Sequence, residues 1–381
     1  MAQTRKTGDY ISSSTVGEEV RAFVPYPLPP QPAIILNDRL SDLMEKANRA
    51  LGRLDGLAAI LPNISLFLRY FIRKEAVLSS QIENTQSTMS DLILFELDER
   101  HGGDAQDVIS YLRAMNYGLD SLRNDFPLSL RLIREIHGEL LTSGLGSDKT
   151  PGEFRRSQNW IGGTRPGNAT FVPPPPDRVM ECMGHLENFL HSGTPVLMKA
   201  ALAHVQFETI HPFLDGNGRL GRLLITFLLC AEEALSQPLL YLSLFLKANR
   251  DTYYQLLQEV RTTGNWEDWL EFFFRGVKET ADQATHTAKT ILTLFEEDQV
   301  KILSLGRAAG SVQRLHTYME RNPIFTVGFT THQLDQTPTT TRAALKRLMK
   351  LGIVGPSFKI GRNQYYAYTA YLALLSEGTE L

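Results

Sequence analysis

Apolar residues recur at helical spacing through most of this chain, and that periodicity restricts the folds open to it. The series begins with Leu40, Leu43, Ala47, Leu51 and Leu54, which are three or four residues apart. Such spacing places apolar side chains on one face of an α-helix. The pattern returns at residues 64–81, 108–122, 128–141, 198–209, 219–234, 250–261 and 266–290. We therefore expect a mainly α-helical protein whose core contains about eight helices.

Two stretches depart from the helical pattern. Residues 24–32, VPYPLPPQP, are rich in proline, which cannot continue a helix, so residues 1–36 are expected to form an extended arm over the surface. Residues 159–176, NWIGGTRPGNATFVPPPP, place β-prone pieces at 159–161 and 169–172 around a glycine- and proline-rich tip. This second pattern predicts a small β-hairpin, and the alternative is an irregular connection.

Composition indicates a water-soluble protein of two or three domains. The 381 residues are 43% hydrophobic and 21% charged, and the net charge of −3 gives no general attraction to nucleic acid or to an anionic membrane. Cys182 and Cys230 are the only cysteines, which suits a reducing cytoplasm and argues against a disulfide framework or a structural zinc site. The most apolar run, from Leu223, is interrupted by acidic residues and proline, and the N-terminus lacks the apolar core of a secretory signal. We expect a cytoplasmic protein with no membrane span.

The composition changes near residue 296, which divides an expected helical domain, 37–295, from a second domain, 296–381. The sequence of the second domain predicts a helix near 310–321, another starting at Thr331, a turn at 336–338 and a third helix over 339–351. A basic hairpin with Gly361 at its tip follows. Two helices joined by a turn and followed by a two-stranded wing are typical of a winged helix-turn-helix domain.

Basic side chains gather in this C-terminal part. Such a patch can contact DNA phosphates, with Thr339, Thr340 and Thr341 at the tip of a recognition helix. The alternatives are that the module forms a homodimer or docks another protein. The basic residues concerned are Arg342, Lys346, Arg347 and Lys350 on the third helix and Lys359 and Arg362 on the wing.

Residues 211–222, HPFLDGNGRLGR, bring specific chemistry to one short turn between two predicted helices. Pro212 ends the first helix, because a residue before proline is biased away from helical angles, and Phe213 is expected to plug the loop into the core. Gly216 and Gly218 allow backbone N–H groups to turn toward one point at the start of the second helix. Such a helix N-terminus is a cradle for phosphate.

The charged residues of the stretch suit the same ligand. Arg219 and Arg222 are three apart, so both guanidinium groups can reach one anion. Asp215 suits a magnesium ion, which takes one or two carboxylates together with phosphate oxygens. His211, whose ordinary pKa is ~6.5, can accept a proton at neutral pH. The stretch predicts a base, a metal ligand and a polyphosphate cradle, and the alternative is a plain turn with solvated arginines.

HPFLDGNGR followed by LGR resembles the signature of Fic-domain proteins at every specified position, and the resemblance extends over roughly residues 40–290. It implies a helical domain that binds ATP with magnesium and transfers AMP to a hydroxyl side chain of a protein, with release of pyrophosphate. His211 is then the general base, Asp215 the magnesium ligand, and residues 216–218 the ligands of the α- and β-phosphates. Arg219 and Arg222 stabilise pyrophosphate or orient the γ-phosphate. The ATP-binding residues implied are Glu83, Gln206, His211, Pro212, Phe213, Leu214, Asp215, Gly216, Asn217, Gly218, Arg219, Arg222 and Asn249.

The resemblance also gives roles to residues outside the loop. Residues 159–172 fall where such proteins carry a flap that aligns the target segment by strand-like pairing. Asn249 matches an asparagine near the adenine or ribose, and the alternative is an ordinary surface polar residue. Gln206 lies about one turn before His211 and either faces the nucleotide or is a plain helix-surface glutamine.

A second motif, Ser79-x-x-x-Glu83-Asn84, resembles the inhibitory helix of the family, here at about 64–90. The resemblance implies that Glu83 pairs with Arg222 in the place of the ATP γ-phosphate, so that bound ATP exposes its α-phosphorus poorly. Alternatively, Glu83 is a surface acid whose salt bridge contributes well under ~1 kcal/mol. The same carboxylate could instead position a water for removing AMP.

The leading interpretation is an autoinhibited protein adenylyltransferase that modifies a Ser, Thr or Tyr hydroxyl of a protein, itself included. One alternative is a DNA-binding transcriptional regulator whose Fic domain senses nucleotide. Another is a Fic enzyme that removes AMP or transfers a different phosphate-containing group. The presence of His211 favours an enzyme, because a sensor needs no base.

Overall fold

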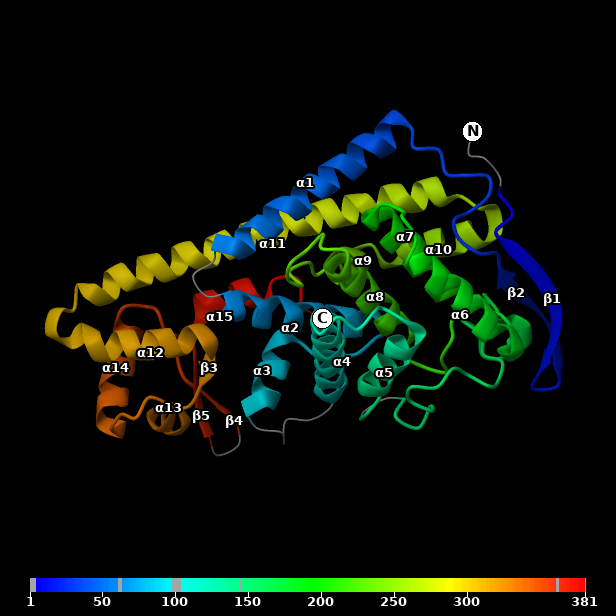
Figure 1. Ribbon diagram of the computed structural model, residues 1–381. Helices are drawn as coiled ribbons and strands as arrows, with labels where there is room; N and C mark the ends of the chain where they lie inside the picture. Colours follow the sequence, from blue (N-terminus) through cyan, green and yellow to red (C-terminus); the bar gives the residue numbers. More distant parts are fainter. Residues whose placement is uncertain (1–4, 61–63, 98–103, 144–145, 361–362, 381) are drawn as a thin grey trace.

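Residues 5–60, 64–97, 104–143, 146–360 and 363–380 are described by the computed structural model (Figure 1). The expectation of a mainly helical protein is confirmed. The predicted helical segments correspond to α1 Asp38–Ile60, α2 Ile64–Ile82, α4 Ala105–Arg123, α5 Leu130–Leu140, α7 Val196–Ile210, α8 Asn217–Ala231, α10 Arg250–Thr263 and α11 Trp266–Leu303. The additional helices are α3 Met89–Leu97, α6 Pro176–Leu190 and α9 Ser243–Ala248.

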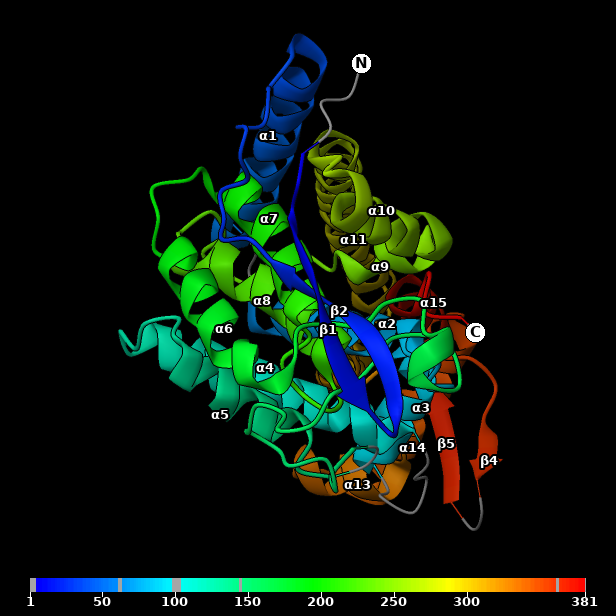
Figure 2. The same cartoon turned by 90° about the vertical axis from the view of Figure 1, so that its right-hand side faces the viewer.

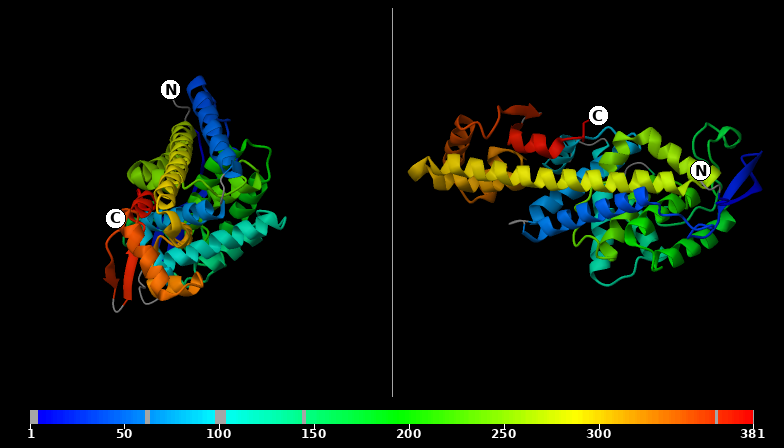
Figure 3. Two further views of the ribbon diagram at one scale, coloured as in Figure 1. Left: turned by 90° about the vertical axis from the view of Figure 1, so that its left-hand side faces the viewer. Right: turned by 90° about the horizontal axis from the view of Figure 1, so that it is seen from above.

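The helices pack as a layered body around one apolar core. Helix α1 lies along α11 over much of its length, as the view from above shows (Figure 3). Beneath this pair, α2 packs against α4 and α9, and α7 packs against α6 and α8. Helix α7 is buried along most of its length, which explains why its sequence is apolar on all sides rather than on one face. Because α7 is central and covered on all sides, it can hold the residue that follows it, His211, in a fixed position.

The N-terminal region differs from the expected extended arm. Residues 8–25 form an antiparallel hairpin of β1 Gly8–Thr15 and β2 Glu18–Pro25 (Figure 2). Val16 and Gly17 make the turn, both with positive φ, as a tight two-residue hairpin turn requires. Alternate residues of β2, among them Val20 and Ala22, are buried, and this alternation was obscured by the proline-rich run after it. Among the described residues before α1, residues 5–7 and 26–37 lie outside the hairpin and lack regular structure.

The hairpin expected at 159–172, which we call the flap, is reduced to one β-bridge between Ile161 and Phe171. Gly162 and Gly163, both with positive φ, turn the chain away immediately after the bridge. The Asn168 side chain then accepts the N–H groups of residues 164 and 165, which closes the tip as a loop rather than as paired strands. The N-terminal hairpin covers the flap, since the Phe23 N–H donates to the Val172 carbonyl (2.9 Å).

The C-terminal part contains four helices and a small antiparallel sheet in the order β3-β5-β4. The second predicted helix begins at Val327 rather than at Thr331, because the Thr326 side chain caps it. Thr341 is buried, so it cannot take part in the proposed tip of a recognition helix, and Gly361 and Arg362 lie outside the described residues. The elements are α12 Ala309–Arg321, β3 Ile324–Phe325, α13 Val327–Gln333, α14 Pro338–Lys350, β4 Phe358–Ile360, β5 Asn363–Ala367 and α15 Thr369–Ser376.

The expected domain boundary at residue 296 falls inside α11, a continuous helix of 38 residues that reaches from the body to the C-terminal elements (Figures 1 and 3). The C-terminal segment 369–380 returns to the body and contacts α2. The Gln81 side chain donates to the Thr379 carbonyl (2.8 Å), and Lys247 donates both to Gln81 (2.8 Å) and to the Glu380 carbonyl (2.6 Å). None of the described helices has the length and apolar character needed to cross a membrane.

Candidate functional site

His211 is the first residue after α7, and its backbone is left-handed (φ 49°, ψ 60°). Its N–H still donates to the Phe207 carbonyl (2.9 Å), so the helix delivers it in a fixed place. Pro212 prevents a further helical turn, because it lacks an N–H group. A non-glycine residue in this conformation is uncommon and needs support from its surroundings.

The His211 imidazole is half-buried, with 20% of its side chain exposed, and its Nδ1 lies 4.0 Å from the Glu208 carboxylate. Burial, together with the positive charges of the nearby Arg261 and Arg155, lowers the pKa of His211 to about 3. The ring is therefore neutral at pH 7. A neutral imidazole with one exposed edge is able to accept a proton from a group that approaches from solvent.

Phe213 and Asn217 shape the loop that follows. Phe213 is fully buried and stacks on the His137 ring, with ring centroids 3.7 Å apart, which confirms its expected role as a plug. The Asn217 side chain accepts the Phe213 N–H and donates to the Phe213 carbonyl, both at 2.9 Å. Asn217 thus closes the loop from inside, and only its backbone N–H remains to meet a phosphate.

The loop ends at the N-terminus of α8. Gly216 has φ 73° at the N-cap, and the first backbone bond of the helix runs from the Leu220 N–H to the Gly216 carbonyl (3.0 Å). The three N–H groups of residues 217–219 therefore have no carbonyl of a preceding helical turn to donate to, and the helix dipole adds partial positive charge there. A Cβ added to Gly218 would lie 2.2 Å from Glu83 Oε1, so a carboxylate already occupies the space beside these amides.

Asp215 lies at the rim of the loop with 42% of its side chain exposed. Its Oδ1 accepts the Gly216 N–H (2.6 Å), and Arg219 lies 3.9 Å away. No group of three or more His, Cys, Asp or Glu side chains in the described part of the chain is arranged to hold a metal ion. A single exposed carboxylate matches the protein share of a magnesium site that phosphate oxygens complete.

Arg222 is buried and faces α2 instead of sharing an anion with Arg219. Its guanidinium donates to the Ser79 hydroxyl (2.8 Å), the Ser79 carbonyl (2.9 Å) and the Glu83 carboxylate (2.9 Å). Asn84 takes the left-handed conformation (φ 69°) that ends α2, and asparagine tolerates this better than most residues. The structure therefore brings Ser79 and Glu83 together with Arg222, while Arg219 stays beside Asp215.

Comparison with known proteins identifies this loop. The model described as Fic/DOC family N-terminal matches residues 41–120, and the Fic/DOC family model matches residues 127–229, which contain the loop. The chain carries a Fic domain. It is 37% identical over 164 residues to a protein named protein adenylyltransferase Fic from Aedes aegypti, covering 42% of this chain and 30% of that protein. A Culex quinquefasciatus protein of the same name is 34% identical over 164 residues, covering 42% and 29%. The chain thus spans less than a third of these relatives' length.

Solved structures agree on the Fic fold. A Fic family protein from Desulfovibrio desulfuricans G20 superposes with a TM-score of 0.58 at 20% identity, covering 88% of this chain and 98% of that chain. A Fic domain containing signaling protein from Bacteroides thetaiotaomicron gives 0.50 at 17% identity, covering 66% and 95%. At these identities the likeness concerns the fold alone.

Two residues expected near the nucleotide have other neighbours. The Gln206 amide donates to the Tyr26 carbonyl (2.9 Å) of the N-terminal region, where it lines a cavity with Trp266. The Asn249 amide donates to the Phe245 carbonyl (2.9 Å) between α9 and α10. These hydrogen bonds of both side chains therefore go to residues outside residues 211–218, which we call the Fic loop.

Three residues around the Fic loop were not expected from the sequence. Arg155 is buried and donates a hydrogen bond to the His211 carbonyl. His137 donates from Nε2 to the Asp215 carbonyl (3.0 Å). Glu208 is buried one turn before His211, and burial raises its pKa to about 7. None stands in a recognisable motif, because their partners are far away in the sequence.

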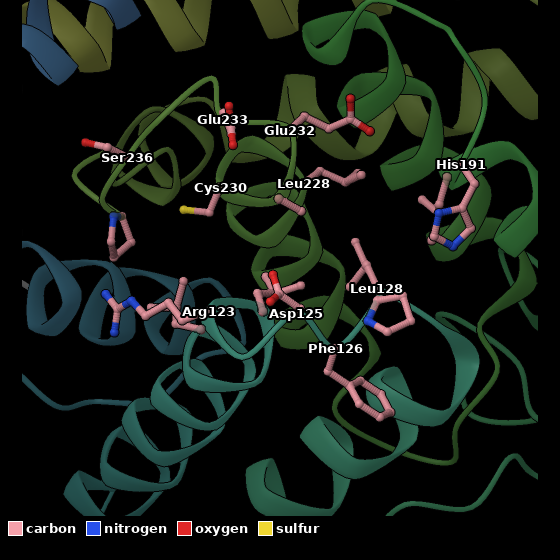
Figure 4. Close-up of a pocket in the computed structure, with 16 residues that line it drawn as sticks. Arg123, Asp125, Phe126, Leu128, His191, Leu228, Cys230, Glu232, Glu233 and Ser236 are labelled. Carbon is pink, nitrogen blue, oxygen red and sulfur yellow. The ribbon is translucent and has the colours of Figure 1, made fainter.

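The cavity drawn in Figure 4 lies elsewhere. Its volume is about 440 Å³, and it is lined by residues such as Leu228 and Cys230 at the C-terminal end of α8, with Arg123 and His191 on the facing elements. The Fic loop is at the opposite, N-terminal end of the same helix. This cavity is therefore separate from the candidate site.

Proposed function

We propose that this protein transfers AMP from ATP to a Ser, Thr or Tyr hydroxyl of a protein in the cytoplasm, itself included. The observation that carries the proposal is a neutral His211 imidazole at the start of the short loop that leads into the free N–H groups at the start of α8. A proton acceptor and an anion cradle are the two parts that nucleotidyl transfer to a hydroxyl requires. The relatives from Aedes aegypti and Culex quinquefasciatus, both named protein adenylyltransferase Fic, support it.

In this reaction the target hydroxyl oxygen attacks the α-phosphorus of ATP. A new oxygen–phosphorus bond forms, while the bond from the α-phosphorus to the bridging oxygen of pyrophosphate breaks. Pyrophosphate leaves with that electron pair, and His211 accepts the proton of the hydroxyl. The N–H groups of residues 217–219 and the Arg219 guanidinium neutralise phosphate charge, so the chain acts through positioning and electrostatics.

Asp215 is the residue that would hold magnesium in this proposal. Its carboxylate is exposed at the rim of the phosphate cradle. A Cβ on Gly146 would lie only 2.4 Å from Asp215 Oδ2, so the facing loop approaches the carboxylate this closely only because residue 146 is a glycine. Bound magnesium supplies additional neutralisation of phosphate charge. The chain itself contributes the single carboxylate and the orientation that the Gly216 N–H gives it.

Glu83 acts in the proposal as a built-in inhibitor. Its carboxylate lies against Gly218 and binds the buried Arg222, so it holds the position that an ATP phosphate would otherwise take. An incoming phosphate and the Glu83 carboxylate are both anions, so they compete for the Arg222 guanidinium. The nucleotide must therefore displace Glu83 or bind in a less productive pose.

We propose that residues 309–376 form a winged helix domain whose α14 faces DNA phosphates. Arg342, Lys346 and Lys350 are exposed along α14, and Lys359 is exposed on β4. Cationic side chains of this kind bind DNA with a strong salt dependence. Titration of the protein with a labelled random DNA duplex at two salt concentrations tests this. Binding that fails even at low salt would favour the alternative roles of this domain, which are docking of another protein or formation of a homodimer that analytical ultracentrifugation detects.

The catalytic proposal is tested by intact-protein mass spectrometry after incubation with magnesium and ATP. The wild type, Glu83→Gly and His211→Ala are compared, and labelled ATP added to a cell extract reveals modification of other proteins. We expect an AMP adduct that grows in Glu83→Gly and is lost in His211→Ala. The absence of AMP transfer in Glu83→Gly to itself and to every extract protein would contradict the proposal.

A further inference from the structure

Arg155 lies between the flap and the Fic loop, and its guanidinium binds both. Nε donates to the His211 carbonyl (2.9 Å), and Nη2 donates to the Ile210 carbonyl (3.3 Å). The same guanidinium also reaches the two ends of the flap, at the carbonyls of Ser157 (3.3 Å) and Pro174. One side chain therefore joins the entry of the flap, its exit and the residue that follows α7.

Backbone and side-chain bonds from the same short segment complete this connection. The Arg155 N–H donates to the Pro212 carbonyl (2.9 Å), and the Asn159 amide donates to the Phe213 carbonyl (3.0 Å). The four successive carbonyls of residues 210–213 thus all accept from residue 155 or residue 159. We call this set of bonds the flap clamp.

The flap clamp satisfies carbonyls that a helix end leaves open. The last carbonyls of α7 have no partner further along the helix, and a cation at a helix C-terminus is electrostatically favourable. It also provides the support that the left-handed backbone of His211 requires. Arg155 is 2% exposed, and the acceptors of its guanidinium are backbone carbonyls, with no ion pair to it among the described residues. Its contacts therefore set geometry rather than balance a charge.

We propose that Arg155 is a positioning residue that fixes the flap relative to His211, so that a target segment held by the flap presents its hydroxyl to the imidazole. This inference rests on the proposed AMP transfer, and it concerns the target rather than ATP. The planar guanidinium is needed because four carbonyls from three separate segments accept hydrogen bonds from it at once. A lysine in its place has a single ammonium group and meets fewer of them.

The test uses the full chain in the Glu83→Gly background, with Arg155→Met and Arg155→Lys as the variants. Arg156→Met is the matched control, because Arg156 is the next residue and its side chain is 87% exposed. Three quantities are measured: the rate of AMP-adduct formation at saturating ATP, the affinity for a fluorescent ATP analogue, and hydrogen exchange of the flap amides.

For Arg155→Met we expect adduct formation at least about tenfold slower, a loss of about 1.4 kcal/mol of transition-state stabilisation. The affinity for the ATP analogue should change less than about twofold, since Arg155 does not contact the phosphate cradle. Exchange at the Ile161 and Phe171 amides, which form the β-bridge, should become faster. The rate of adduct formation in Arg155→Lys should lie between the rates of the parent and of Arg155→Met. The rate in Arg156→Met should equal that of the parent.

Unchanged adduct formation in Arg155→Met would overturn the inference, and so would a parallel loss of ATP affinity and thermal stability, which indicates a general folding role. If Arg155→Met does not fold, Asn159→Ala removes one bond of the flap clamp and should slow adduct formation in the same direction. If the Glu83→Gly parent transfers no AMP, the proposed activity fails. The exchange measurement still decides whether Arg155 holds the flap.

Discussion

Replacing Glu83 should make the protein faster and less stable at the same time. The Glu83 carboxylate and the Arg222 guanidinium are 2.9 Å apart, and 2% of the Arg222 side chain and 38% of the Glu83 side chain are exposed. A hydrogen bond to a charged group contributes ~1.5–3 kcal/mol. Since solvent screens the half-exposed carboxylate, we take the lower end, about 1.5–2 kcal/mol. If ATP must replace this contact, Glu83→Gly should raise the rate of AMP transfer about 10- to 30-fold.

The same change leaves Arg222 buried without a carboxylate, so Tm should decrease. The rate is measured as AMP adduct against time by mass spectrometry, and Tm by scanning calorimetry. Glu83→Gln, which keeps the shape and an acceptor but loses the charge, should give a smaller increase in rate. Glu279→Gln on the exposed face of α11 is the control and should change neither quantity. A rate increase below about threefold in Glu83→Gly would refute the competition between carboxylate and phosphate.

Further predictions concern the residues that shape the loop. In Gly218→Ala the added Cβ would also lie 3.1 Å from Arg222, so the affinity for a fluorescent ATP analogue should fall about tenfold or more, and wild-type affinity would contradict a phosphate at this amide. Phe213→Ala should lower the free energy of unfolding by about 3–5 kcal/mol in urea titration, and a loss below about 1 kcal/mol would show that the plug is dispensable. His137 accepts the Gly152 N–H at Nδ1, so protonation is disfavoured, and burial lowers its pKa to about 4. The folded-state pKa of His137 lies below its unfolded value. The contribution of His137 to the free energy of unfolding is therefore fully present above pH 6.5 and is lost as the pH falls from 6.5 toward 4. In His137→Gln the decline of the unfolding free energy over this range should be shallower by up to about 1.4 kcal/mol per pH unit, and an unchanged slope would rule out His137 as its source.

The helices and the Fic loop could be predicted because their signals are local. Periodicity of apolar residues identifies a helix wherever one side is buried, and Phe213 between polar neighbours indicates an anchor. The flap was predicted less well, because its fold depends on the Asn168 side chain closing the tip rather than on strand propensity. The role of Arg155 could not be predicted at all. The partners of its guanidinium are backbone carbonyls up to 56 residues away, and a carbonyl carries no sequence signature.

The same limit applies to Asn217 and Arg222. The Fic signature placed both around a ligand, whereas the structure turns the Asn217 side chain inward to close the loop. Arg222 turns toward α2 and binds Glu83, which is the pairing that the second motif implied. In each case a polar side chain had two reasonable partners, and tertiary packing decided between them. Motif reasoning therefore identified the Fic loop along the chain, which the Fic/DOC family model matches, but did not establish which side chains point toward its phosphate cradle.

The contact of residues 369–380 with α2 has a consequence for the order in which a newly made chain acquires its contacts. A ribosome delivers α2, the Fic loop and Arg222 long before it delivers Thr379, since Gln81 and Thr379 are 298 residues apart. The Glu83–Arg222 pair can form as soon as α8 has emerged, but the hydrogen bond from Gln81 to the Thr379 carbonyl must wait until residue 379 has been synthesised. A chain that stops within α15 would therefore keep every residue of the loop and lose this anchor.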